Sequence, residues 1–256
     1  MRVRGGEPDD LAPAFYAAPR FVRNQRLREW WTLLHPPYTL CHLSFVVIGA
    51  CIKGPVSASR LIVTLVAFFF AVGIGAHALD ELHDRPLSTA IPSWQLAIAS
   101  IAGIGVACAL GVVGVFYVNT ALVYFIVAGV LLAVAYNLEL LHGLLHNDLT
   151  FAIGWGAFPA LTSYFSQHQS LNITAVATAL FTSLVALTQR QLSTPARLLR
   201  RSAVAFEGDI TWRDGHRSEL SRAMLLAPLE RALSLLCWAS IVLALSLACA
   251  RFFVHI

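Results

Sequence analysis

The sequence is poor in charged residues, which make up 12% of its 256 positions. A soluble domain usually carries about twice that share. Hydrophobic residues make up 57% of the chain instead. Water-facing side chains cannot cover so much apolar surface, so the composition excludes an ordinary soluble globular fold and indicates a protein that is surrounded by lipid.

Paired cysteine motifs are also missing. The five cysteines lie inside apolar stretches, and none forms a Cys-x-x-Cys pair, which indicates small buried side chains and not a redox or zinc motif. The first 29 residues are polar and rich in arginine, with no apolar core of the kind that a secretory signal needs. We therefore expect no cleavable signal peptide.

Basic residues are absent between Arg85 and Arg190. Most of the 18 lysines and arginines lie near the N-terminus or between Arg190 and Arg231. This clustering is typical of the cytoplasmic loops of membrane proteins and is not the pattern of a nucleic-acid-binding surface. We expect no nucleic-acid partner.

Seven apolar runs meet or approach the length of about 20 residues that a membrane-spanning helix needs. They predict an all-α fold, a polytopic transmembrane bundle of about seven spans (seven to nine). The runs are Tyr38–Ile52, Leu61–Leu79, Leu96–Tyr117, Ala121–Tyr136, Leu149–Phe165, Leu171–Leu187 and Ala232–Ala250.

The distribution of basic residues predicts the orientation of this bundle. With the N-terminus in the cytoplasm and seven spans, only Lys53, Arg60 and Arg251 lie outside, and the other fifteen lysines and arginines lie inside. We therefore predict a multi-pass integral protein of a prokaryotic cell membrane with a cytoplasmic N-terminus.

The chain is predicted to divide into two regions. Residues 1–37 are predicted to form a cytoplasmic N-terminal segment, in which Arg20–Leu34 is expected to be a basic, aromatic-rich helix at the membrane surface. Residues 38–256 are predicted to form a single transmembrane domain.

That domain includes a long cytoplasmic loop at about residues 190–231. At the end of the loop, Glu219–Arg231 is expected to be an amphipathic helix with Ser218 as its N-cap.

Ionisable residues gather where the second apolar run ends. His77, Asp80 and Asp84 are spaced i, i+3 and i+7, which places them on one face of a continuing helix. Asp80 and Asp84 can share Mg²⁺, which prefers oxygen ligands and can in turn hold a diphosphate. Glu81 is a secondary candidate. Such residues also mark membrane boundaries, but ionisable groups at membrane depth are costly and usually functional.

A second group follows the fourth apolar run, which leaves the membrane on the same side as the second. Glu139, His142 and His146 again have the i, i+3, i+7 spacing, and neutral imidazoles suit Zn, Fe or Cu. We expect the two stripes to meet around one polar cavity. A metal ion shared between them would take its ligands from His77, Asp80, Asp84, His142 and His146.

Asp80 and Asp84 also lie in a stretch, Ala76–Leu87, that resembles a family motif. The chain resembles the UbiA superfamily of intramembrane prenyltransferases, in which Asn-Asp-x-x-Asp-x-x-x-Asp precedes an Arg-Pro-Leu-type tail. Ala76 and His77 stand here in place of the leading Asn-Asp. Two further stretches are similar to the family. One is His35-Pro36 with Gly49-Ala50 downstream, and the other is Tyr136 followed by Gly154-Trp-Gly-Ala-Phe-Pro159. Together the three similarities cover roughly residues 30–165.

The chain also departs from the family pattern. A second acidic motif is expected after the sixth span, but Thr188–Arg197 contains no acid. Asp209, further along the chain, is a weak match to this motif. Histidines replace the basic residue that is expected after Tyr136. Nine helices are typical of the family, whereas seven apolar runs are present here.

The resemblance implies an enzyme that transfers a prenyl group from an allylic diphosphate to an acceptor with Mg²⁺. On this hypothesis Asp80 and Asp84 hold the ion and act in catalysis. Arg85, Arg190 and Arg197 bind the diphosphate, because guanidinium groups match phosphate oxygens. A membrane isoprenoid chain occupies the apolar interior.

Two alternatives keep the fold without prenyl transfer. In the first, Fe or Zn bound by His77, Asp80, His142 and His146 supports an enzyme that acts on a lipid or quinone. In the second, the protein binds an isoprenoid or quinone without catalysis. The sequence names neither the substrate nor any protein partner.

Overall fold

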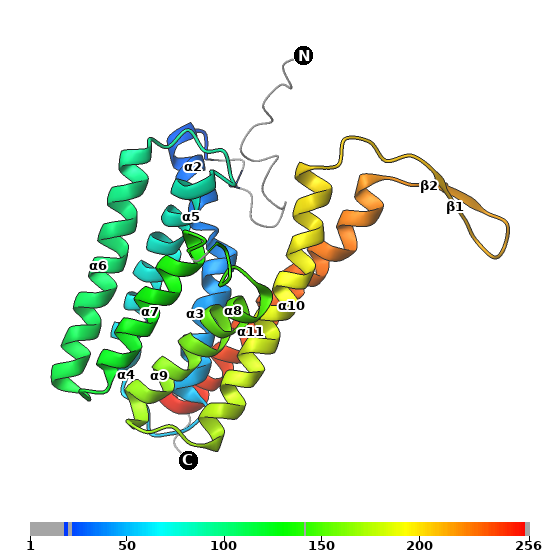
Figure 1. The fold of residues 1–256 in the computed structure, drawn as a ribbon. Coiled ribbons are helices and arrows are strands. Elements are labelled where there is room, and N and C mark those ends of the chain that lie inside the picture. The colour runs from blue at the N-terminus through cyan, green and yellow to red at the C-terminus, as the bar shows by residue number, and fades with distance from the viewer. Residues whose placement is uncertain (1–17, 20–21, 141, 254–256) are drawn as a thin grey trace.

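The computed structural model describes residues 18–19, 22–140 and 142–253, which form a bundle of helices (Figure 1). Two of the helical segments contain a stretch of π-helix, labelled η. The helices are α2 (Gln25–Leu34), α3 (Pro36–Cys51), α4 (Ala58–Phe68), η2 (Phe69–Ala76), α5 (His77–Asp84), α6 (Ser93–Tyr117), α7 (Leu122–Asn137), α8 (Asp148–Phe151), η3 (Ala152–Ala157), α9 (Phe158–His168), α10 (Ile173–Arg201) and α11 (Arg222–Phe252).

The helices confirm the expected membrane character of the chain. Within the described part of the chain, five helical stretches are long and apolar enough to cross a membrane, and α7 is a shorter apolar helix. All seven predicted apolar runs fall mainly within helices, which confirms an all-α membrane bundle, whereas the number of spans stays a prediction. The five stretches are Gln25–Cys51, Ala58–Asp84, Ser93–Tyr117, Ile173–Arg201 and Arg222–Phe252.

The chain bends between α2 and α3. His35 has a left-handed backbone (φ 43°), and its amide donates back to the Trp31 carbonyl oxygen over 3.1 Å. Two prolines then open α3, because their missing N–H groups are tolerated in a first helical turn. Helix α2 covers the second half of the predicted surface helix and packs against α5. Residues 1–17, 20 and 21 of the predicted N-terminal segment lie outside the described residues.

Glycines bring the π-helical stretches close to their neighbours. A Cβ at Gly103 of α6 would lie 2.6 Å from the carbonyl oxygen of Phe70 in η2. A Cβ at Gly156 of η3 would lie 2.6 Å from the carbonyl oxygen of Thr182 in α10. Small residues of this kind let transmembrane helices approach backbone to backbone. The two π-helical stretches also lie near the candidate site described below. Functional sites are a common location for π-helix.

About half of the long predicted loop is helical. Helix α10 continues through Pro195 to Arg201, and α11 begins at Arg222. Ser221 is the N-cap of α11, since its hydroxyl accepts a 3.2 Å hydrogen bond from the Met224 amide. The prediction of Ser218 as the cap is therefore wrong.

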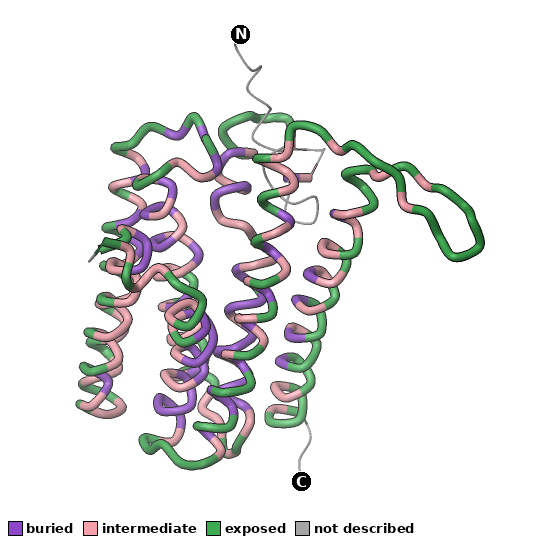
Figure 2. The backbone as a smooth tube through the Cα atoms, turned by 45° about the vertical axis from the view of Figure 1, so that its right-hand side comes forward, coloured by how far each residue is buried: buried purple, intermediate pink, exposed green. Residues whose placement is uncertain are grey.

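A two-stranded hairpin occupies most of the remaining connection. Its strands are β1 (Asp209–Thr211) and β2 (Arg217–Glu219), which are antiparallel. The hairpin projects from the bundle and is largely exposed (Figures 1 and 2). Arg200 of α10 and Glu230 of α11 form an ion pair that joins these two helices.

Burial is concentrated on the interior helices. Helix α3 packs against α9 and α11, and ten of its sixteen residues are buried. In α6, by contrast, the buried residues are Leu96, Ser100 and Gly103, so most of this apolar helix faces outward. An outward face without polar residues is suited to lipid.

Candidate functional site

Helix α5 presents the first predicted group at one end of the bundle. Asp80 is half-buried, whereas Asp84 is exposed and the helix stops there because Arg85 adopts a left-handed backbone (φ 52°). His77 is held at the start of the helix, with its Nδ1 3.2 Å from the Gly73 carbonyl oxygen. Its ring centre lies 5.4 Å from that of His35.

Glu81 and Arg85 build the loop that follows α5. The fully buried Glu81 carboxylate accepts hydrogen bonds from the Leu87 amide (2.9 Å), the Thr89 amide (2.8 Å) and the Thr89 hydroxyl (2.8 Å). Arg85 donates to the carbonyl oxygens of Thr89 (3.3 Å) and Ile91 (2.7 Å). Both side chains are thus engaged with protein groups, and neither is presented to a metal ion or a diphosphate.

The second predicted stripe does not form. Helix α7 ends at Asn137, and Glu139 (φ 47°) and His142 (φ 58°) have left-handed backbones, as does Gly143 (φ 75°). The chain turns instead of continuing as a helix, so the i, i+3, i+7 argument for Glu139, His142 and His146 is wrong. His142 is exposed in this turn.

An aromatic and polar group forms around Tyr136 at the end of α7. The Tyr136 ring stacks on the His146 ring, with centroids 4.5 Å apart, and contacts Trp155 at 4.4 Å. His146 Nδ1 lies 3.2 Å from the Tyr136 carbonyl oxygen and 3.5 Å from Glu139 Oε1. The turn after α7 therefore folds His146 back over the end of its own helix.

Arg190 links this group to α10. Its Nε donates to Asp148 Oδ1 over 2.5 Å, and its Nη1 donates to the Tyr136 hydroxyl. The guanidinium also lies 5.1 Å from the centre of the Phe151 ring. Asp148 thus balances the charge that was predicted to meet a diphosphate, and Arg190 holds α8 against α10.

Arg197 lies two turns beyond Arg190 on α10 and is exposed. Its guanidinium donates to the Thr194 hydroxyl over 3.4 Å, and no carboxylate among the described residues forms an ion pair with it. Asp80 lies within electrostatic range of both Arg197 and His146. The ends of α5 and α7 and the last twelve residues of α10 (from Arg190) therefore surround one polar region, which we call the polar end.

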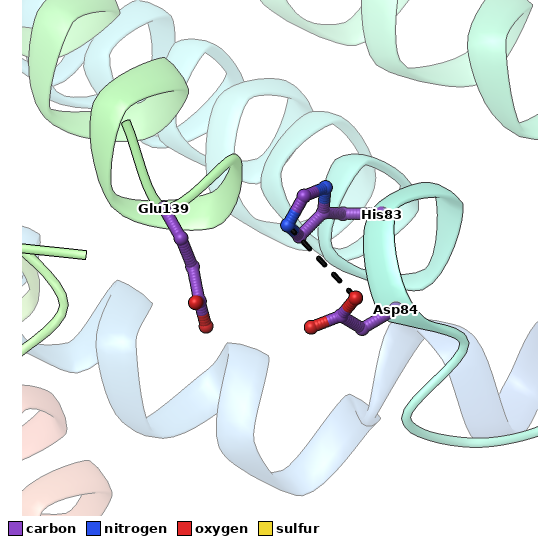
Figure 3. Close-up of side chains that lie close together, drawn as sticks. All are labelled: His83, Asp84 and Glu139. Atoms are coloured by element: carbon purple, nitrogen blue, oxygen red, sulfur yellow. Dashed lines mark ion pairs between the residues drawn. The ribbon is translucent and has the colours of Figure 1, made fainter. Parts of the chain in front are cut away.

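A compact group of possible metal ligands lies at the edge of the polar end (Figure 3). Ligand atoms of His83, Asp84 and Glu139 lie within 4.8 Å of one another, and His83 Nε2 is 3.9 Å from Asp84 Oδ1. Throughout the described ranges, no other set of three or more His, Cys, Asp or Glu residues is so close. The structure therefore brings Asp84 and Glu139 together, but it does not assemble the predicted set with His77, Asp80, His142 and His146.

The chemistry of this group fits Mg²⁺ in part. The carboxylates of Asp84 and Glu139 are the hard oxygen donors that Mg²⁺ prefers, and both can approach one ion. His83 adds a nitrogen donor, which is better suited to Zn or Fe. Asp209 is not part of the group, because it lies on the projecting β1–β2 hairpin opposite Glu219.

An apolar cavity of about 290 Å³ runs between α4, η2, α6, α7, η3 and α9. Ala76, Ala133 and Trp155 line it where it approaches the polar end. Ala76 directly precedes His77, and Trp155 packs against Tyr136. A long apolar molecule in the cavity would therefore place one of its ends beside the polar region.

Sequence reasoning missed the partners that complete this site. The role of Asp148 depends on a contact with Arg190, 42 residues away, and no local pattern marks it. The cavity likewise depends on the packing of six elements.

Comparison of the chain with protein-family models, with curated proteins and with solved structures gave no match.

Proposed function

We propose that this protein is a divergent UbiA-like prenyltransferase that transfers a prenyl group from an allylic diphosphate to an acceptor. The observation that carries the proposal is the apolar cavity that ends beside the polar end, at Ala76 and Trp155. A prenyl diphosphate has the matching form, with an apolar chain and an anionic head. The resemblance to the family adds the expected reaction.

Arg197 is the best-placed cation for the diphosphate. It is exposed beside Asp80 and has no carboxylate partner within the described part of the chain. Arg190 is closer to the aromatic group, but Asp148 already balances its charge. A guanidinium that forms no ion pair keeps its donors available for phosphate oxygens, whereas one that is already paired does not.

Asp84 and Glu139 are the residues that would hold Mg²⁺. When bound, this ion supplies positive charge that stabilises the diphosphate as it leaves. The apolar lining of the cavity has a separate role, because it keeps water away from the allylic carbon and so favours attack by the acceptor.

Release of diphosphate from an allylic diphosphate by the purified protein tests this proposal. We expect release with Mg²⁺ and a fall of at least about tenfold in Asp84→Asn and Glu139→Gln, because each loses a charged ligand. Asp214→Asn, in the exposed hairpin turn, is the matched control and should keep full activity. No release by the unaltered protein with any acceptor fraction of the membrane would refute prenyl transfer.

Isoprenoid or quinone binding without transfer is the second candidate. It is favoured by the position of Asp209 on the projecting hairpin, which leaves the polar end without the second acidic motif that the family uses. Mass spectrometry of lipids that copurify with the protein separates the two, since a binder retains an isoprenoid but releases no diphosphate. Retained Fe or Zn would instead favour a metal enzyme that uses His83.

A further inference from the structure

The cavity also extends to the opposite end of the bundle, and we call its two ends the mouth at the polar end and the opposite mouth. At the opposite mouth it is lined by Ser59 and Arg60 of α4, Tyr117 at the end of α6 and Ser166 of α9. Arg60 and Ala76 lie sixteen residues apart on one helical segment, so the two mouths are roughly 20–25 Å from each other. This opposite mouth plays no part in the proposed transfer reaction.

Arg60 is fixed at this mouth by backbone carbonyl groups. Its Nη1 donates to the carbonyl oxygens of Ser166 (3.3 Å) and Gln167 (3.2 Å) at the end of α9. The Gln167 side chain in turn accepts from the Ser57 amide over 2.8 Å, which joins α9 to the start of α4. The guanidinium is therefore held in one orientation, and its Nε and Nη2 donors have no partner among the described residues.

Among the described residues, the charged side chains at this end of the bundle are all basic. The described acids lie in α2, α5, the turn after α7, α8, the connection from α10 to α11 and the third turn of α11, and none lies in the α3–α4 connection, in α4 or in the last turns of α11, which contain Lys53, Arg60 and Arg251 respectively. Lys53, Arg60 and Arg251 lie at the opposite end, where the described chain has no carboxylate to balance them. An anion is therefore the complementary ligand.

We propose that this mouth binds the phosphate headgroup of an anionic lipid whose chain enters the cavity. Phosphate oxygens suit the Nε and Nη2 donors of Arg60, because a guanidinium binds phosphate through paired hydrogen bonds. The apolar walls behind Arg60 favour a lipid over a free phosphate ion. The protein thus accepts a lipid from the membrane leaflet opposite the polar end, and this lipid competes with a prenyl diphosphate because both chains would occupy the same cavity.

Equilibrium binding of radiolabelled phosphatidylglycerol and phosphatidylcholine to the purified full chain in neutral detergent tests this site. We expect the protein to prefer the anionic lipid, and Arg60→Gln to weaken phosphatidylglycerol binding about tenfold and phosphatidylcholine binding less, because the choline cation already opposes the Arg60 charge. Lys53→Gln removes the same charge at the same end but does not line the cavity, so it should leave the preference intact. Arg60→Lys should retain part of the preference for phosphatidylglycerol, because the lysine keeps the positive charge.

Ala107→Phe tests whether the lipid chain enters the cavity, because Ala107 lines it on α6. This variant should weaken the binding of both lipids, and millimolar inorganic phosphate should displace neither. The proposal is overturned if the unaltered protein shows no preference or if Arg60→Gln binds like it. Unchanged binding by Ala107→Phe, or displacement by inorganic phosphate, would likewise exclude a lipid in this cavity. Even if Arg60→Gln does not fold, the affinities of the unaltered protein for the two lipids still test whether it prefers the anionic one.

Discussion

Substitution of Glu81 separates residues that support the site from residues that act in it. Glu81 and Asp84 lie three positions apart on α5, and sequence patterns place both among the candidate ligands. In the structure Glu81 is fully buried and bonded to the following loop, whereas the Asp84 side chain is 71% exposed. We therefore expect Glu81→Ala to lower stability and Asp84→Ala to lower function alone.

The structure sets the size of the effect. Glu81→Ala leaves the buried amides of Leu87 and Thr89 without an acceptor, and each buried amide without a partner costs about 1–3 kcal/mol. The free energy of unfolding should fall by about 2–6 kcal/mol, which for a chain of this size lowers Tm by at least about 4 °C. Asp84→Ala should change it by less than about 0.5 kcal/mol. Glu81→Gln retains one oxygen acceptor and should lie between the two.

Thermal unfolding in detergent and hydrogen exchange measure this contrast. In Glu81→Ala, peptides that cover residues 85–92 should exchange faster, because the carboxylate that protects two of their amides is gone. Peptides from α10 should be unchanged. Equal Tm and equal exchange in Glu81→Ala and the unaltered protein would refute a structural role for Glu81.

Three further predictions concern the fold. A double-mutant cycle with Arg200→Gln and Glu230→Gln should give a coupling of about 1–3 kcal/mol in unfolding experiments, since both side chains are more than four-fifths buried; zero coupling would contradict the ion pair. Gly103→Ala should cost about 1–3 kcal/mol, because its Cβ would meet the Phe70 carbonyl, while Gly105→Ala, with open space around it, should not destabilise the protein. Cysteines introduced near Arg26 and Arg213 should be labelled only from the cytoplasm, and labelling of both from outside would refute the predicted orientation.

The helices could be predicted because each depends on its own residues. Apolar runs of about 20 residues have few alternatives to a helix in lipid, since each backbone amide must find a partner inside the segment. The extension of α10 to Arg201 is different, because it passes Pro195 and is joined to α11 through Arg200 and Glu230. That pairing of distant segments shortened the loop that the polar composition had predicted.

The turn after α7 shows why the second predicted stripe does not form. Helical spacing of Glu139, His142 and His146 requires a continuing helix, but the backbone becomes left-handed at Glu139, His142 and Gly143. Gly143 was a signal for a turn in this segment, because glycine readily adopts a left-handed conformation. Asp84 and Glu139 meet nonetheless, because α5 and α7 end at the same level of the bundle.

Photocrosslinking tests the central claim that the cavity holds an isoprenoid chain with its anionic head at the polar end. The purified protein is irradiated with a photoactivatable allylic diphosphate, and the labelled residues are identified by mass spectrometry. We predict labels in η2, α7 and η3, around Ala76, Ala133 and Trp155, that an excess of unlabelled allylic diphosphate removes. Labels confined to the outward face of α6, or labels that competition does not remove, would contradict the account.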